Sequence, residues 1–157
     1  MLGIALALGC AAAPAPAPDP HTQLEAAHQD LARAGFGFDA DVNFARDPYV
    51  VCEAISCAEL QVRNGRRTVL LAREAWDSPE RLRASLLDIW GRYQKPRAPD
   101  YRDKAESALR VLSDGPRVGI ADPVFLRRVY HMYRQLWSQV PPSQLGALPR
   151  PDDLAYP

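Results

Sequence analysis

Hydrophobic and polar residues alternate most regularly on the two sides of Asn64-Gly65. An Asn-Gly pair suits the positive φ angles of a type I′ turn, so the alternation predicts a β-hairpin that spans about residues 60–71. Pairing Arg63 with Arg66 sets the register of the two strands. This register places Leu60 opposite Val69 on an apolar face, while the intervening polar side chains lie on the other face.

A further strand is predicted before the hairpin, over residues 49–52. Four residues join it to the next strand, so the two strands would be antiparallel and Cys52 would lie opposite Cys57. In this arrangement Tyr49 and Val51 continue the apolar face, beside Leu60 and Ala58 respectively. Opposed strand residues lie within the Cα separation that a disulfide requires, and we therefore expect a structural Cys52–Cys57 disulfide.

A redox or metal role for these cysteines is the alternative. Their C-x4-C spacing lacks the C-x-x-C pattern of thioredoxin-like motifs. The three histidines, His21, His28 and His131, form no cluster with the spacing of metal ligands. We expect no metal and no cofactor.

Apolar residues recur with helical spacing in four segments of the chain. The segments lie near residues 22–34, 79–93, 100–112 and 123–140. Asp77-Ser78-Pro79 and Asp122-Pro123 are typical helix starts, and pairs of prolines follow the second and fourth segments. The predicted fold is α+β: one helix, a three-stranded antiparallel meander, and three helices that pack on the apolar face of the sheet.

Proline marks the two ends of this domain. Nine of the fifteen prolines lie in residues 11–20 and 141–157, which leaves residues 21–140 as a single domain. The stretch 141–157 is predicted to be an extended, Pro-rich tail. Such a segment either lies along its own domain or docks on a partner, and the sequence does not choose between these.

The first ten residues, MLGIALALGC, form an uncharged apolar run that is too short to span a bilayer but has the length of a signal-peptide core. Residues 6–10, Leu-Ala-Leu-Gly-Cys, resemble the lipobox of bacterial lipoproteins. The resemblance covers only this terminus, and no family is recognised for the domain. It implies a signal peptide over residues 1–9, cleavage before Cys10, and a lipid on the Cys10 thiol.

Residues 10–20 then form a tether between lipid and domain. Alternating Ala and Pro favour an extended polyproline conformation of about 3.1 Å per residue, hence a spacer of roughly 30 Å. By the same resemblance, Ala11 after the lipidated cysteine suggests the outer membrane, with the domain facing the periplasm. Assigning Cys10 to lipid leaves Cys52 and Cys57 as a pair, in a compartment that permits disulfides.

The charges of the chain argue against nucleic acid as a partner, because the formal net charge is zero. They are nevertheless unevenly distributed: residues 21–60 carry a net charge of −5 and residues 61–97 a net charge of +5. Arg63, Arg66 and Arg67 at the hairpin tip are candidate contacts for an anion or a partner. The opposed like charges of Arg63 and Arg66 destabilise the tip slightly, and a bound acidic group would relieve this.

The chain contains no G-x-S-x-G, P-loop, H-E-x-x-H or Rossmann glycine motif. We therefore expect a cell-envelope lipoprotein with a non-enzymatic accessory, adaptor or assembly role, which binds an envelope protein. The alternative is an envelope hydrolase that acts on peptidoglycan or another glycan through acidic residues. Glu53, Glu59 and Glu74 are the candidates for its carboxylate pair.

Overall fold

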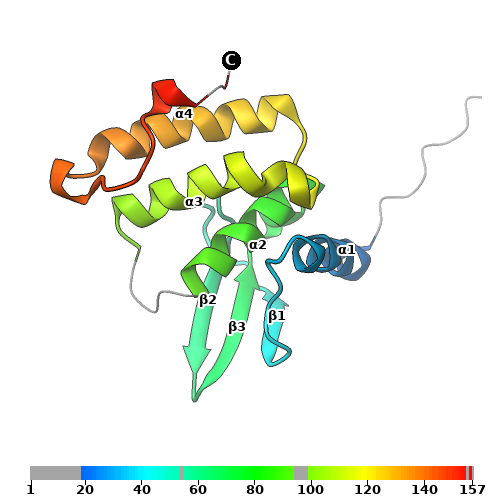
Figure 1. Cartoon of the computed structure of the whole chain (residues 1–157). Helices are drawn as coiled ribbons and strands as arrows, with labels where there is room; N and C mark the ends of the chain where they lie inside the picture. Colours follow the sequence, from blue (N-terminus) through cyan, green and yellow to red (C-terminus); the bar gives the residue numbers. More distant parts are fainter. Residues whose placement is uncertain (1–18, 54, 94–98, 155, 157) are drawn as a thin grey trace, which may run out of the picture.

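Four helices and a three-stranded sheet make up the structure, a computed structural model that describes residues 19–53, 55–93, 99–154 and 156 (Figure 1). The helices are α1 (Pro20–Arg33), α2 (Pro79–Tyr93), α3 (Tyr101–Asp114) and α4 (Pro123–Gln139). The strands are β1 (Val42–Arg46), β2 (Ala58–Arg63) and β3 (Arg66–Leu71). Short 3-10 turns are η1 (Arg73–Trp76), η2 (Gly115–Val118), η3 (Pro142–Gln144) and η4 (Pro151–Asp153). The predicted α+β class is confirmed.

The β2–β3 hairpin has the predicted turn and register. Asn64 and Gly65 have φ angles of 50° and 74°, as a type I′ turn requires. Leu60 lies opposite Val69, and Arg63 lies opposite Arg66. The local Asn-Gly signal was therefore sufficient to predict this part of the sheet.

The prediction for the remaining strand is wrong in position and direction. The strand is β1, not residues 49–52, and it pairs in parallel with β3, so the sheet is mixed and has the order β1-β3-β2. The chain leaves the sheet after Arg46. There the side chain of Asp47 accepts a hydrogen bond from the N–H of Tyr49 (2.8 Å), and Pro48 has no N–H to donate to a ladder.

The helices are stacked in layers on one side of the sheet (Figure 1). Helix α2 packs on the sheet and against α1, α3 packs on α2, and α4 packs on α3. From α1, His28 reaches the sheet, with its ring centroid 4.2 Å from that of Phe44 in β1. The prediction that the helices pack on the sheet thus describes α2, whereas α3 and α4 form outer layers.

Acidic and hydroxyl side chains cap the helices where the sequence predicted starts. Ser78 Oγ accepts a hydrogen bond from the N–H of Arg81 (3.1 Å) at α2. Asp122 caps α4, and Asp100 forms a reciprocal capping box with Asp103 at α3. These bonds satisfy backbone donors that have no partner inside the helix.

Helix α2 is the centre of the core, because it is covered by the sheet, α1 and α3. It contributes both apolar and polar buried residues, namely Leu82, Ala84, Ser85, Leu86, Leu87, Asp88 and Ile89. Such a run exceeds the single apolar stripe of a surface helix. Two of its members, Ser85 and Asp88, are polar and require partners.

The C-terminal tail lies along its own domain, which settles the alternative that the sequence left open. Tyr133 Oη donates a hydrogen bond to the carbonyl of Pro149 (2.6 Å), and Tyr130 Oη donates to that of Pro151 (3.2 Å). The hydroxyl of Tyr156 in turn donates to the carbonyl of Leu112 in α3 (2.5 Å). The tail therefore covers α4 and reaches α3.

Because Tyr133 is buried under the tail, we expect the stability of the folded protein to fall at alkaline pH. Burial raises the pKa of Tyr133 to about 12. Because this folded-state pKa exceeds the unfolded value of about 10, the folded protein retains the proton longer, and its stability falls as the pH rises from about 10 to 12. The Tyr133→Phe variant lacks the hydrogen bond to Pro149, so its free energy of unfolding at pH 7 should be about 1 kcal/mol lower than that of the wild type. It should also lose less stability between pH 8 and 11 than the wild type.

Urea unfolding at each pH measures both effects. Tyr49→Phe, at an exposed tyrosine, is the matched control and should follow the wild-type profile. Equal alkaline losses in Tyr133→Phe and the wild type would contradict the assignment.

Candidate functional site

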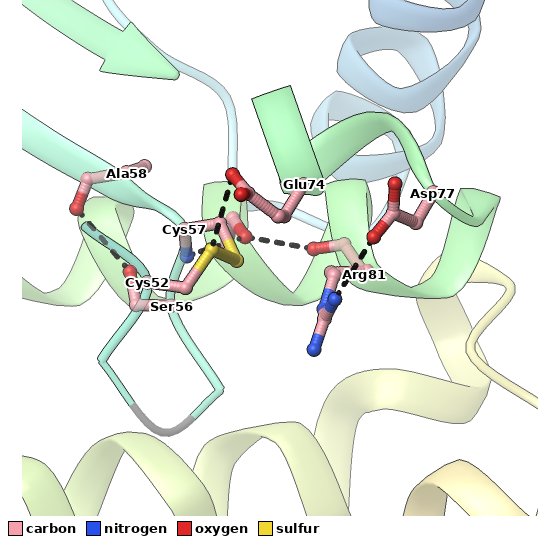
Figure 2. The surroundings of a disulfide bond; sticks show 8 residues. Cys52, Ser56, Cys57, Ala58, Glu74, Asp77 and Arg81 are labelled. Atoms are coloured by element: carbon pink, nitrogen blue, oxygen red, sulfur yellow. Dashed lines mark hydrogen bonds and ion pairs between the residues drawn. A yellow bond between two sulfur atoms is a disulfide. The ribbon is translucent and has the colours of Figure 1, made fainter. Parts of the chain in front are cut away.

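The segment between β1 and β2 carries the Cys52–Cys57 disulfide, and we call its described residues, 47–53 and 55–57, the disulfide loop (Figure 2). The two Cα atoms are 4.0 Å apart. Glu53 and Ser56 exchange backbone hydrogen bonds of 2.8 and 2.9 Å, which makes a tight antiparallel turn. This turn alone places Cys52 opposite Cys57, so the predicted disulfide is present although residues 49–52 form no strand.

The disulfide loop is fixed to three other elements. Ser85 of α2 accepts a hydrogen bond from the N–H of Cys57 (3.0 Å) and donates one to the carbonyl of Arg81 (2.8 Å). Asp47 N–H donates to the carbonyl of Leu71 at the end of β3 (3.0 Å). The carboxylate of Glu53 pairs with the ammonium group of Lys104 in α3 at 3.0 Å. The loop is therefore held by β3, α2 and α3 as well as by its own disulfide.

Two apolar side chains of the loop face solvent. Tyr49 is 89% exposed and Val51 is 78% exposed, whereas Val50 between them is only 8% exposed. The prediction placed Tyr49 and Val51 on the apolar face of the sheet, and it is wrong. The alternation of buried and exposed side chains is displaced by one residue from the predicted one. Val50 enters the core, and its neighbours Tyr49 and Val51 point outward.

A shallow groove of about 200 Å³ lies beside this pair. Its walls come from the disulfide loop, the start of β2 and the end of α2, and are formed by Val50, Val51, Glu53, Ser56, Ala58, Glu59, Arg92 and Pro99. The hydrogen bond from Lys104 lowers the pKa of Glu53, which stays ionised at neutral pH. The groove thus combines apolar walls with two carboxylates and the guanidinium group of Arg92.

The three glutamates of the hydrolase alternative occupy different surroundings. Glu53 and Glu59 both line the groove, whereas the carboxylate of Glu74 lies 4.0 Å from Cys52 Sγ (Figure 2). A disulfide sulfur carries no proton, so this last contact is not a hydrogen bond. A general acid for glycan cleavage needs a raised pKa, and the lowered pKa of Glu53 makes it unsuited to that role.

The three arginines of the hairpin separate into two groups. Arg63 and Arg66 face each other at the exposed tip. Arg67 instead stacks over the ring of Tyr93, 4.3 Å from its centroid, and pairs with Asp39 at 3.4 Å. Arg63 and Arg66 are the pair available to a partner at the tip. The predicted lipidation site, Cys10, lies outside the described residues.

Sequence reasoning missed Asp88, a buried carboxylate whose side chain is only 1% exposed. Arg92 pairs with it at 2.7 Å, and Ser107 Oγ of α3 donates a hydrogen bond to it. The adjacent cavities of about 20 and 40 Å³ are too small for a substrate. Asp88 therefore acts as a polar tie between α2 and α3.

Ser85 should be more important for stability than an ordinary helix serine. Ser85→Ala leaves the buried N–H of Cys57 without its acceptor and should lower the free energy of unfolding by about 1–3 kcal/mol. Ser138→Ala is the matched control, since Ser138 Oγ also bonds a carbonyl of its own helix but is exposed. Its effect should stay within about 0.5 kcal/mol. Urea unfolding of both variants measures the difference, and equal effects would show that Ser85 does not anchor the loop.

Within the described residues, no helix combines the length and apolarity needed to cross a membrane. The same residues contain no group of three or more His, Cys, Asp or Glu that could hold a metal ion. Comparison of the chain with models of known protein families, with curated proteins and with solved structures finds no match.

Proposed function

We propose that this chain is a lipid-anchored protein of the bacterial cell envelope with a non-enzymatic adaptor or assembly role, and that it binds a protein partner through the disulfide loop. The observation that carries the proposal is the outward-facing pair Tyr49 and Val51. They are the two most exposed of the large apolar side chains in the described part of the chain. Large apolar side chains that a fixed loop keeps in water are candidates for contact with a partner.

The anchoring of the loop supports a binding role. The disulfide, the Ser85 hydrogen bonds and the Glu53–Lys104 pair hold the loop before any partner arrives. A loop fixed in this way loses little conformational entropy on binding. Its exposed tyrosine also belongs to the residue types enriched at interfaces.

The groove defines the chemistry of the partner. Glu59 and the Lys104-paired Glu53 line it together with Arg92, beside the apolar side chains of Val50 and Val51. A complementary surface presents a Lys or Arg side chain to the carboxylates and an apolar patch to Tyr49 and Val51. The partner is therefore an envelope protein with an exposed basic and apolar segment.

The amino terminus supports the envelope location. The lipobox-like residues 6–10 would place a lipid on Cys10, and α1 begins ten residues later at Pro20. The Ala/Pro-rich residues between them would act as a spacer from the membrane, in keeping with an outer-membrane protein that faces the periplasm. The Cys52–Cys57 disulfide is in keeping with an oxidising compartment.

The anchor is tested by the intact mass of the native protein from the membrane fraction, measured with and without reduction and alkylation. We expect loss of residues 1–9, added lipid mass on Cys10, and two cysteines that react only after reduction. Cys10→Ser should move the protein to the soluble fraction, while Ser143→Ala should leave it in the membrane. An unlipidated chain with three free thiols would refute the envelope location.

The binding surface is tested by replacing Val51 with a photo-crosslinking residue in intact cells. The control carries the same residue at Val124, which is also an exposed valine (59%) but lies in α4. We expect one specific protein adduct from position 51 and none from position 124. The identified partner should then bind the purified chain, and Tyr49→Ala should weaken this binding at least tenfold.

Two results would contradict the binding role. One is an identical adduct pattern from positions 51 and 124. The other is turnover of purified sacculi that a single Glu59→Gln change abolishes, which would establish the hydrolase alternative.

A further inference from the structure

Strand β2 is a terminal strand of the sheet, since the order is β1-β3-β2 and no further strand of the described residues pairs with it. Its ladder with β3 shows which backbone groups point outward. Ala72 N–H donates to the carbonyl of Cys57 (2.9 Å), so odd-numbered residues of this segment bond toward β3. The N–H and C=O groups of Leu60 and Val62 therefore point to the open edge.

This edge lacks several of the features by which proteins protect a terminal strand, and its charged side chains are Glu59 and Arg63. β2 has six residues and contains no Pro or Lys, and its pairing with β3 runs without a bulge. Val62 is 60% exposed because the hairpin extends beyond the helices (Figure 1). The open edge thus presents both backbone groups and an apolar side chain.

The sequence of β2, Ala-Glu-Leu-Gln-Val-Arg, complements itself when two copies run antiparallel about Gln61. In that register Leu60 lies opposite Val62 of the other copy. Glu59 lies opposite Arg63, and the twofold axis passes between the two Gln61 residues. The pairing therefore matches apolar with apolar side chains at positions 60 and 62, and acidic with basic side chains at positions 59 and 63.

We propose that two copies of this chain associate edge to edge through β2, which joins their sheets into one continuous six-stranded sheet. About four backbone hydrogen bonds form between the Leu60 and Val62 residues of the two copies. The Glu59 and Arg63 pairs lie at positions without ladder hydrogen bonds, where Cα atoms approach to about 4.5 Å and side chains are closest. By symmetry the dimer contains two such charge pairs, and each copy contributes one Glu59 and one Arg63.

Charge complementarity favours a second copy as the occupant of this edge. Arg63 lies opposite Arg66 within its own hairpin, and in the dimer it gains the carboxylate of Glu59. The register also brings Asn64 of each tip next to Ala58 of the other copy, beside the groove that Glu53 and Glu59 line.

This association goes beyond the proposed partner binding and requires neither that partner nor the lipid on Cys10, although both associations use Glu59. A dimer without a bound partner, or a partner bound to a monomer, would separate the two proposals. Cross-linking of the full chain in cell membranes and in purified form tests the association directly.

The first test is a Gln61→Cys variant under mild oxidation. Facing positions without ladder hydrogen bonds have a Cα separation suited to a disulfide, so the introduced thiol should link two chains in high yield. Gln135→Cys is the matched control, an exposed glutamine of α4 remote from the sheet. Equal dimer yields from the two variants would overturn the proposal, as would adducts of Gln61→Cys with another protein only.

The register is tested by mixing two single variants. Glu59→Cys and Arg63→Cys should each give little covalent dimer alone. In the proposed register a thiol at position 59 faces Arg63 of the other copy, and a thiol at position 63 faces Glu59. A mixture of the two chains should give a covalent heterodimer. A homodimer from either variant at the yield of the mixture would exclude the register about Gln61.

The charges are tested by reversal. Glu59→Arg or Arg63→Glu alone creates two like-charge pairs in the dimer and should raise the dimer dissociation constant about tenfold in sedimentation equilibrium. The double variant Glu59→Arg/Arg63→Glu restores opposite charges and should return the constant to within about threefold of wild type. A wild-type chain that sediments as a monomer at a concentration of about 100 μM, or a double variant weaker than both single variants, would refute the proposal.

Discussion

The burial of α2 is the constraint on which the rest of the structure depends. The helix has the sheet on one side and α1 and α3 on others, so most of its circumference excludes water. Its two buried polar residues make contacts in different directions. Ser85 bonds the N–H of Cys57 at the base of the disulfide loop, and Asp88 bonds Ser107 of α3. One helix therefore sets the position of both the loop and the outer helical layers, and a shift of α2 would disturb them together.

The disulfide loop shows how a fold can hold apolar groups in water. Burying a valine or a comparably large apolar side chain typically contributes about 1.5–3 kcal/mol, and Tyr49 and Val51 forgo most of that gain. The chain cannot recover it by a local slip, because Val50 is buried on one side of Val51 and the disulfide fixes Cys52 on the other. The exposure of this pair is thus built into the fold.

The sequence predicted the features that depend on neighbours along the chain. Asn64-Gly65 predicted the hairpin and its register, and Asp122-Pro123 predicted the start of α4. The parallel pairing of β1 with β3 has no such local signal, because its partners are far apart in the sequence. The apolar run at residues 49–52 therefore appeared the better strand, although the turn at Asp47 ends the sheet before it.

The site was predictable in part for the same reason. The Cys52–Cys57 disulfide depends on a turn of four residues and was found, whereas the outward direction of Tyr49 and Val51 depends on which neighbour enters the core. Asp88, four residues before Arg92, looks in sequence like an ordinary surface ion pair. Only the packing of α3 over Asp88 makes this a buried ion pair instead of a surface one.

The contact between α4 and the C-terminal tail has a consequence for recognition. Proline lacks an N–H, so a proline-rich segment presents carbonyl acceptors and few donors. Tyr130 and Tyr133 match this chemistry, because their hydroxyls donate to the carbonyls of Pro151 and Pro149. For these two hydroxyls the tail is an intramolecular ligand, covalently attached at an effective concentration of millimolar order. A proline-rich segment of another protein would have to outcompete that intramolecular ligand before it could use the same surface.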